Sequence, residues 1–200
     1  MRIKLTQTTV KYFIITGVST YSGGNTTITV YGGTDYDLAN AAITSPYYST
    51  QKAPQGFPLS PIKWTVKTTS TDSYATATPT ANTWYTYANL VISVPIGVWK
   101  LGYQANVGVD GSSVTGVIVQ ATLSTANNSE SDTEFTCFTR SEGASGNITL
   151  NTFVSKEKYV SISSKTSYYL LNKTASTGIA NITFPGGNGN NLIMAVSAYL

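Results

Sequence analysis

The feature that most constrains the fold is the stretch 87–109, YANLVISVPIGVWKLGYQANVGV. Apolar residues take alternate positions in both of its halves, which is the period of a half-buried β-strand. Pro95 separates the halves, because proline has no N–H to donate to a sheet. We therefore expect two strands that fold back at 95–97 and share one apolar face. The alternating residues are Leu90, Ile92 and Val94, then Trp99, Leu101, Tyr103, Ala105, Val107 and Val109.

The composition favours an all-β protein with few charges. The chain has 200 residues, enough for a substantial core, and only 10% of them are charged, compared with about a quarter in an average protein. Threonine, serine, asparagine, glycine and tyrosine are abundant instead. The net charge of +3 comes from 12 basic and 9 acidic residues that are scattered singly. This pattern argues against a nucleic-acid partner, which requires a basic patch or stripe.

The first 60 residues are expected to form a small β-rich domain. Strands are predicted at 2–8, 11–18 and 26–32, and a short helix is predicted at 35–43, where an aspartate would cap it. The following segment at 51–61, QKAPQGFPLSP, contains three prolines and is expected to be an extended linker. We place the domain boundary near Ser60.

Residues 61–200 are expected to form a jelly-roll β-sandwich. Short strands follow one another at the spacing of a sandwich, and Asp110-Gly111 predicts a tight hairpin between two of them. The ten predicted strands are 62–70, 83–94, 98–109, 113–124, 133–140, 147–155, 158–164, 166–172, 178–184 and 191–200.

The last predicted strand, NLIMAVSAYL at 191–200, is apolar on both faces. Such a strand is typical of the middle of a sheet rather than its edge. We expect the opposite sheet to cover one face and another copy of the chain to cover the other, with the C-terminus buried. The predicted oligomer interface consists of Leu192, Met194, Val196 and Tyr199.

Little in the sequence predicts catalysis. The chain has no histidine, which removes the commonest general base and the commonest transition-metal ligand. The single cysteine, Cys137, is expected to be a small buried hydrophobe. Two carboxylate pairs, Asp35 with Asp37 and Asp132 with Glu134, would suit acid–base hydrolysis. Their turn-like neighbours favour solvated loop and capping roles.

No metal or cofactor site is predicted. Asp110, Asn188 and Asn190 offer oxygen atoms that calcium accepts, but turn chemistry explains them better. The loop PGGNGNN at 185–191 lacks the lysine of a phosphate-binding loop. We therefore predict no catalytic residue, no cofactor and no enzymatic activity.

Aromatic residues are the remaining candidates for ligand binding. Trp84, Tyr85, Tyr87 and Tyr168 lie where adjacent rings point to opposite faces of a strand, so some rings are expected to face outward. An exposed ring can stack on a sugar while nearby amides and hydroxyls bind the sugar hydroxyls. The alternative is that these rings pack on a sheet face or in an oligomer contact.

The N-terminal segment IKLTQTTVKYFII lacks the continuous apolar region and cleavage site of a signal peptide. No run approaches the roughly 18 apolar residues of a membrane helix. We expect a chain made without a secretion signal and without membrane insertion.

The order of elements from Trp64 to Leu200 resembles the jelly-roll heads of the complement C1q and tumour necrosis factor type. The shared features are an early strand, an apolar strand that ends at a proline, a Gly-Val-aromatic strand at 97–99 and an apolar C-terminal strand. The resemblance implies that the first and last strands pair in the inner sheet. It also implies that three heads pack through that face.

The segment 26–66 resembles stretches of tail and minor structural proteins of bacteriophages and prophages. The two resemblances imply a structural or adhesive virion protein of a tail, baseplate or fibre, localised in the virion. Its expected partners are copies of itself, as a homotrimer or higher ring, other virion proteins and a host-surface glycan or protein. The alternatives are a polysaccharide-degrading tail spike and a monomeric carbohydrate-binding module.

Overall fold

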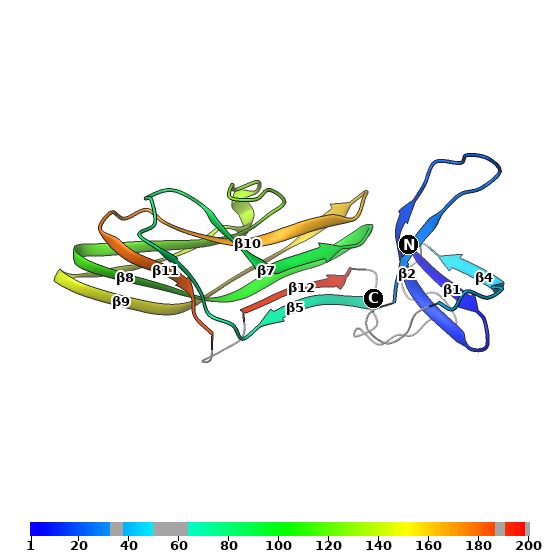
Figure 1. The fold of residues 1–200 in the computed structure, drawn as a ribbon, viewed down its shortest axis with the longest axis horizontal. Helices are drawn as coiled ribbons and strands as arrows, with labels where there is room; N and C mark the ends of the chain where they lie inside the picture. Colours follow the sequence, from blue (N-terminus) through cyan, green and yellow to red (C-terminus); the bar gives the residue numbers. More distant parts are fainter. Residues whose placement is uncertain (33–37, 50–63, 187–190, 199–200) are drawn as a thin grey trace.

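The structure is a computed structural model that describes residues 1–32, 38–49, 64–186 and 191–198. These residues form two antiparallel sheet systems, as Figure 1 shows. The smaller sheet has the strand order β3-β2-β1-β4, and the larger one follows the order β5-β12-β8-β10-β7, with β6, β9 and β11 attached to it. The predicted all-β sandwich is confirmed.

The strands have the following bounds. The small sheet contains β1 (Arg2–Thr6), β2 (Val10–Val18), β3 (Ile28–Tyr31) and β4 (Thr44–Ser49). The sandwich contains β5 (Thr65–Ser70), β6 (Tyr74–Ala77), β7 (Tyr85–Val94), β8 (Gly97–Ser124), β9 (Cys137–Ile162), β10 (Thr166–Thr174), β11 (Ile179–Phe184) and β12 (Asn191–Ser197).

The small sheet confirms the three strands predicted in the first 32 residues. Its apolar cluster is formed by alternate residues of β1 and β2, as the period of a strand requires. The sequence did not predict β4, whose side chains are exposed or half-buried and which contains Pro46. The clustered residues are Ile3, Leu5, Phe13 and Ile15.

The helix predicted at 35–43 is wrong over its described part. Residues 38–43 contain no helical turn, whereas 33–37 lie outside the described residues. The side chain of Gln7 explains the difference, because its Nε2 donates to the carbonyl oxygens of Ala39 and Ala41 at 2.9 and 3.1 Å. The N–H of Ala39 donates in turn to Gln7 Oε1 at 3.1 Å. Backbone groups that a helix would use are bound to this side chain instead.

The sandwich is built around β8, which belongs to both layers. The first half of β8 pairs with β12, its middle pairs with β11 and its last residues pair with β10. In Figure 1, β5 and β12 lie along one margin, while β7 and β10 form the layer packed against them. β12 pairs with β5 on one side and β8 on the other, so the predicted central position of this strand is confirmed.

The core confirms the alternating pattern in 87–109. The side chains of that pattern point between the layers and are almost completely buried. The predicted turn is also present, because β7 ends at Val94 and β8 begins at Gly97. Trp99 Nε1 donates to the carbonyl oxygen of Pro95 at 2.8 Å and fastens this turn from inside the core. Gly97 has a φ of 139°, which favours glycine.

The hairpin predicted at Asp110-Gly111 is wrong, because β8 continues through both residues to Ser124. Asp110 and Gly111 pair with β11 on one side and with β9 on the other. Two neighbouring strands therefore hold the backbone extended and override the turn preference of the dipeptide. The register shifts that follow Gly111 mark the place where the β8–β9 pair passes between the layers.

The segments predicted as three strands between 133 and 164 form a different arrangement. Residues Thr133–Phe135 form a short 3-10 helix, and Cys137–Ile162 form the single strand β9. The long pairing with β8 keeps this segment extended through its glycines. β6 was not predicted from the sequence.

The two sheet systems meet at the N-terminus. The Arg2 guanidinium carbon lies 4.5 Å from the ring centroid of Trp64, and Arg2 Nη2 donates to Ser197 Oγ at 3.4 Å. Ile14 joins the main core, and burial lowers the pKa of Arg2. Among the described residues, no strand pairs across the two sheets. The predicted linker at 51–61, which includes the predicted boundary near Ser60, lies outside the described residues.

Candidate functional site: an outer sheet face and a polar loop network

A groove of about 860 Å³ lies on the outer face of β12, β8 and β9. It forms because these strands place three rows of side chains next to each other. Val196 lies opposite Lys100, Met194 opposite Gly102 and Leu192 opposite Gln104. On the other side of β8, the same three positions face Tyr159, Glu157 and Ser155 in that order.

Gly102 lies at the centre of the groove lining and contributes no side chain. A Cβ atom at this position would lie 2.7 Å from Glu157 Cβ and 2.7 Å from the carbonyl oxygen of Lys156. A Cβ atom does not approach non-bonded atoms so closely, so β8 and β9 can adopt this spacing only with glycine at position 102. The bare centre of the face thus follows from the close approach of the two strands.

The two sides of the groove differ in chemistry. β12 supplies an apolar row in which Met194 is 38% exposed although it lies in mid-sheet. β9 supplies Tyr159, which is 67% exposed, and Glu157, whose Oε1 lies 2.6 Å from Lys100 Nζ. The hydrogen bond to Glu157 raises the pKa of Lys100. The face can therefore accept an apolar surface along β12 and polar groups beside it.

Three of the four predicted interface residues lie together here. Leu192, Met194 and Val196 line the groove, whereas Tyr199 lies outside the described residues. The opposite face of β12 carries Ile193 and Ala195, which are fully buried in the core. Both faces of β12 therefore carry apolar side chains, as the sequence pattern predicts.

The predicted ligand-binding rings do not form an exposed platform. Trp84, Tyr87 and Tyr168 are at most 9% exposed, and Tyr85 is half-buried. The ring of Trp84 is covered by Lys173, whose Nζ lies 4.4 Å from the ring centroid. The structure thus places these rings in the packing arrangement that was the alternative interpretation.

Hydrogen bonds and ring contacts hold the buried tyrosines. Tyr87 donates from its hydroxyl to Asn172 Oδ1 at 3.1 Å and packs edge-on against Phe184, with centroids 5.5 Å apart. Tyr168 packs edge-on against Phe135 at 6.2 Å. Burial raises the pKa of Tyr87 and of Tyr168.

The exposed aromatic residue of the groove, Tyr159, was not identified as a candidate from the sequence. Its position in KEKY offered one signal, because neighbouring charges indicate a solvated strand. Phe138 and Phe153 on the same strand are also exposed, at 65% and 49%.

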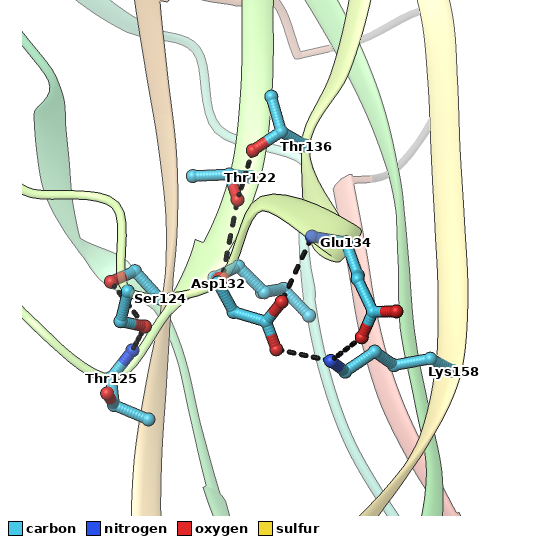
Figure 2. A network of polar contacts seen from close by, with 9 residues as sticks. Thr122, Ser124, Thr125, Asp132, Glu134, Thr136 and Lys158 are labelled. Atoms are coloured by element: carbon cyan, nitrogen blue, oxygen red, sulfur yellow. Dashed lines mark hydrogen bonds and ion pairs between the residues drawn. The ribbon is translucent and has the colours of Figure 1, made fainter.

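A polar network closes the loop between β8 and β9, and Figure 2 shows it from close by. Lys158 of β9 lies between two carboxylates of this loop and forms ion pairs with Asp132 and with Glu134, the latter at 2.5 Å. Asp132 also caps the 3-10 helix, because its Oδ1 accepts the Glu134 N–H at 3.0 Å. The predicted capping role is confirmed for Asp132.

The ion pairs of Lys158 with Asp132 and Glu134, which we call the Lys158 clamp, shift the pKa values of Asp132 and Lys158. Burial alone would raise the pKa of Asp132, but the bonds from Lys158 and the Glu134 N–H outweigh it and lower the pKa. Burial would lower the pKa of Lys158, but the hydrogen bonds and charges of Asp132 and Glu134 outweigh burial and raise it. One ammonium group thus engages both carboxylates and stabilises their charged forms.

Serine and threonine hydroxyls order the rest of the same loop. The buried Ser124 donates from Oγ to the carbonyl oxygen of Ser129 at 2.6 Å and accepts the Ala126 N–H at 3.0 Å. Thr136 Oγ1 lies 3.1 Å from Thr122 Oγ1. These bonds fold the loop back onto the end of β8 (Figure 2).

Of the remaining candidate residues, the structure describes only Asp110. Asp110 lies within β8, while Asn188, Asn190, Asp35 and Asp37 lie outside the described residues. Within the described parts of the chain, no group of three histidine, cysteine or carboxylate side chains could hold a metal ion.

Cys137 is half-buried and packs against the main core, close to the predicted role of a small hydrophobe. Within the described segments, no helix has the length and hydrophobicity of a transmembrane helix.

Comparison with known proteins provides no family assignment. The sequence matches no protein-family model, and a search of curated proteins gives no match.

Proposed function

We propose that this chain is a structural and adhesive protein of a phage tail, baseplate or fibre, and that it assembles as a homotrimer or higher ring through the groove face. The observation that carries the proposal is the position of β12. This apolar strand lies in mid-sheet and still presents Met194, 38% exposed, to the outside. A central strand with an apolar outer row is stabilised when another subunit covers it.

Symmetry explains how copies of one chain would cover this face. A rotation that closes into a ring removes the apolar row of every copy from water with a single type of contact. The pairing of β5 with β12 also fits the C1q and tumour necrosis factor type of head that the sequence resembles. In those heads, three subunits pack through the sheet that contains the first and last strands.

The composition supports a virion role independently. Few charges, many hydroxyl and amide side chains and a single cysteine suit a β structure that stays folded outside a cell without disulfides. Adhesion to a host-surface glycan or protein is part of the proposal, and Tyr159 is an exposed ring that lines the groove.

The alternatives make different demands on the groove. A polysaccharide-degrading spike would need two carboxylates lining it, and Glu157 is the one carboxylate among the described lining residues. A monomeric carbohydrate-binding module would need a flat aromatic platform and no apolar face for a partner. The exposed row of β12 favours the assembly proposal over both.

A pair of charge variants tests the assembly. Met194→Asp places a charge in the outer row, and Asn89→Asp adds the same charge to an exposed position of β7 as the control. Light scattering should show that Met194→Asp has a lower mass than the wild type while Asn89→Asp keeps the wild-type mass. Equal masses for the two variants would contradict the proposed interface. A glycan array with the assembled protein then separates an adhesin, which binds, from a scaffold.

A further inference from the structure

The free edge of β9 is the longest unpaired strand edge in the described part of the molecule. β9 pairs with β8 over most of Cys137–Ile162 and with no other described strand. In Figure 1 it runs along the outside of β8 at the margin of the sandwich. Unpaired N–H and C=O groups along a strand edge are a template for another strand, and proteins normally block such edges.

Two other edge strands of this protein, β4 and β7, carry features that block further pairing. β4, an edge of the small sheet, contains Pro46, which has no N–H to donate. β7, an edge of the sandwich, is covered by side chains. Thr68 Oγ1 donates to the carbonyl oxygen of Val91 at 2.8 Å, and the Thr86 N–H donates to Asn128 Oδ1 at 3.0 Å.

Charged residues lie toward both ends of β9. Arg140 and Glu142 mark its first part, and residues 156–158, Lys-Glu-Lys, mark its last. Between them, Ile148–Ser155 has the sequence ITLNTFVS, with no charge and no proline. We call this segment the open edge. It is rich in β-branched and aromatic residues, and Phe153 within it is 49% exposed.

We propose that the open edge of one copy pairs antiparallel with the open edge of a second copy, around a two-fold axis perpendicular to the sheet. Such a contact is isologous, so each copy supplies the same segment and satisfies the backbone groups of the other. Every strand pairing described in this protein is already antiparallel.

The side-chain pattern suits this occupant. A two-fold axis perpendicular to the sheet keeps residues of one face opposite each other. With the axis at Thr152, Leu150 lies opposite Val154 of the second copy, and Asn151 lies opposite Phe153. The flanking Lys-Glu-Lys at 156–158 then lies opposite 146–148, Gly-Asn-Ile, which carries no charge. No like charges face each other across the junction, a condition that strand pairing favours.

The edge contact differs in direction from the groove contact of the proposed function, and the two share only Ser155 among the described residues. The groove lies on a face of the sheet, whereas the open edge extends the sheet sideways. A face-mediated trimer would be joined to a second trimer through the open edges, so the edge contact doubles the number of chains. Loss of the edge contact would leave trimers, and loss of the face contact would leave edge-paired dimers.

Charge variants with a swap test the edge contact. Asn151→Lys/Phe153→Lys places lysines opposite lysines across the axis, and Asn151→Glu/Phe153→Glu does the same with glutamates. Native mass spectrometry should show that the wild-type chain forms an even number of copies and that each variant alone halves that number. Mixing the two variants should restore the wild-type number, because lysine then faces glutamate.

Two controls keep the test decisive. Ser161→Lys adds charge to an exposed site on β9 outside the open edge, and it should leave the mass unchanged. Thr149→Lys/Ser155→Lys, at two exposed positions that also lie opposite each other across the axis, replaces the first double variant if circular dichroism shows that the latter unfolds. A wild-type chain with an odd copy number, a lysine variant of wild-type mass, or a mixture that fails to recombine would each overturn the edge pairing.

Discussion

Met194 of β12 lies directly opposite Gly102 of β8, and Gly102 lies opposite Glu157 of β9. Gly102 therefore lies between an apolar and a charged side chain and has no side chain on this face. The same residue that opens the groove also lets β8 and β9 approach closely. The outer face and the packing of the long β8–β9 pair are thus two consequences of one small residue.

Gly102→Ala is expected to destabilise the protein. The new Cβ would meet the β9 backbone and Glu157 Cβ at 2.7 Å, and this overpacking should cost about 1–3 kcal/mol. Gly116→Ala is the matched control on the same strand, because its Cβ would lie 3.4 Å from the carbonyl oxygen of Ser141. Urea unfolding measures both. Equal stabilities would show that the close approach at Gly102 is not a constraint.

Ile193→Asp and Met194→Asp are expected to behave differently although they are adjacent. Ile193 is fully buried, so an aspartate there should cost several kcal/mol and prevent folding. Met194 is 38% exposed on the outer face, so its variant should fold and lose only the assembly through that face. Circular dichroism during heating separates the two results. A cooperative transition for Ile193→Asp at the wild-type temperature would mean that the face assignment of β12 is reversed.

The Lys158 clamp is expected to make stability depend on pH at both extremes. The pKa of Asp132 is lower in the folded protein than the ordinary 3.8, so its contribution is present above that value and is lost as the pH falls through the folded pKa. The pKa of Lys158 is raised above 10.5, so its contribution is present below that value and is lost as the pH rises through the folded pKa.

Lys158→Met isolates this clamp. The variant should lose about 1 kcal/mol at neutral pH, because both ion pairs are partly exposed. Its stability should also change less between pH 7 and pH 3 than that of the wild type. Denaturant unfolding across this range gives the comparison. A parallel pH profile for the two proteins would assign no role to the clamp.

Trp99→Phe is expected to loosen the turn between β7 and β8. It removes the Nε1 bond to the buried carbonyl of Pro95, and an unpaired buried acceptor costs about 1–3 kcal/mol. Hydrogen exchange at 95–99 should accelerate, while exchange in the small sheet should stay the same. Unchanged protection at this turn would show that the apolar packing of the ring alone holds it.

The fold of the sandwich was predictable where burial repeats at the period of a strand. Leu90, Leu101 and Ile193 belong to runs in which every second side chain enters the core, and these runs defined β7, β8 and β12. The hairpin prediction at Asp110 was wrong because it used only a local signal. Asp-Gly is a local turn signal, and the pairing of β8 with strands on both sides is a non-local effect that the local signal does not contain.

The candidate site was predictable on β12 and not on β9. The outer row with Met194 followed from an apolar pattern on both faces of one segment. Tyr159 and Gly102 became part of the same surface only through pairing between strands distant in sequence. Trp84 shows the converse, because its aromatic neighbourhood suggested an exposed ring and Lys173 covers it in the fold.

The mass of the unmodified protein in solution tests the central claim most directly. Size-exclusion chromatography with multi-angle light scattering, run at micromolar concentration, should give at least three times the chain mass of 21.3 kDa. A particle of 21.3 kDa at that concentration would contradict assembly through the outer face of β12.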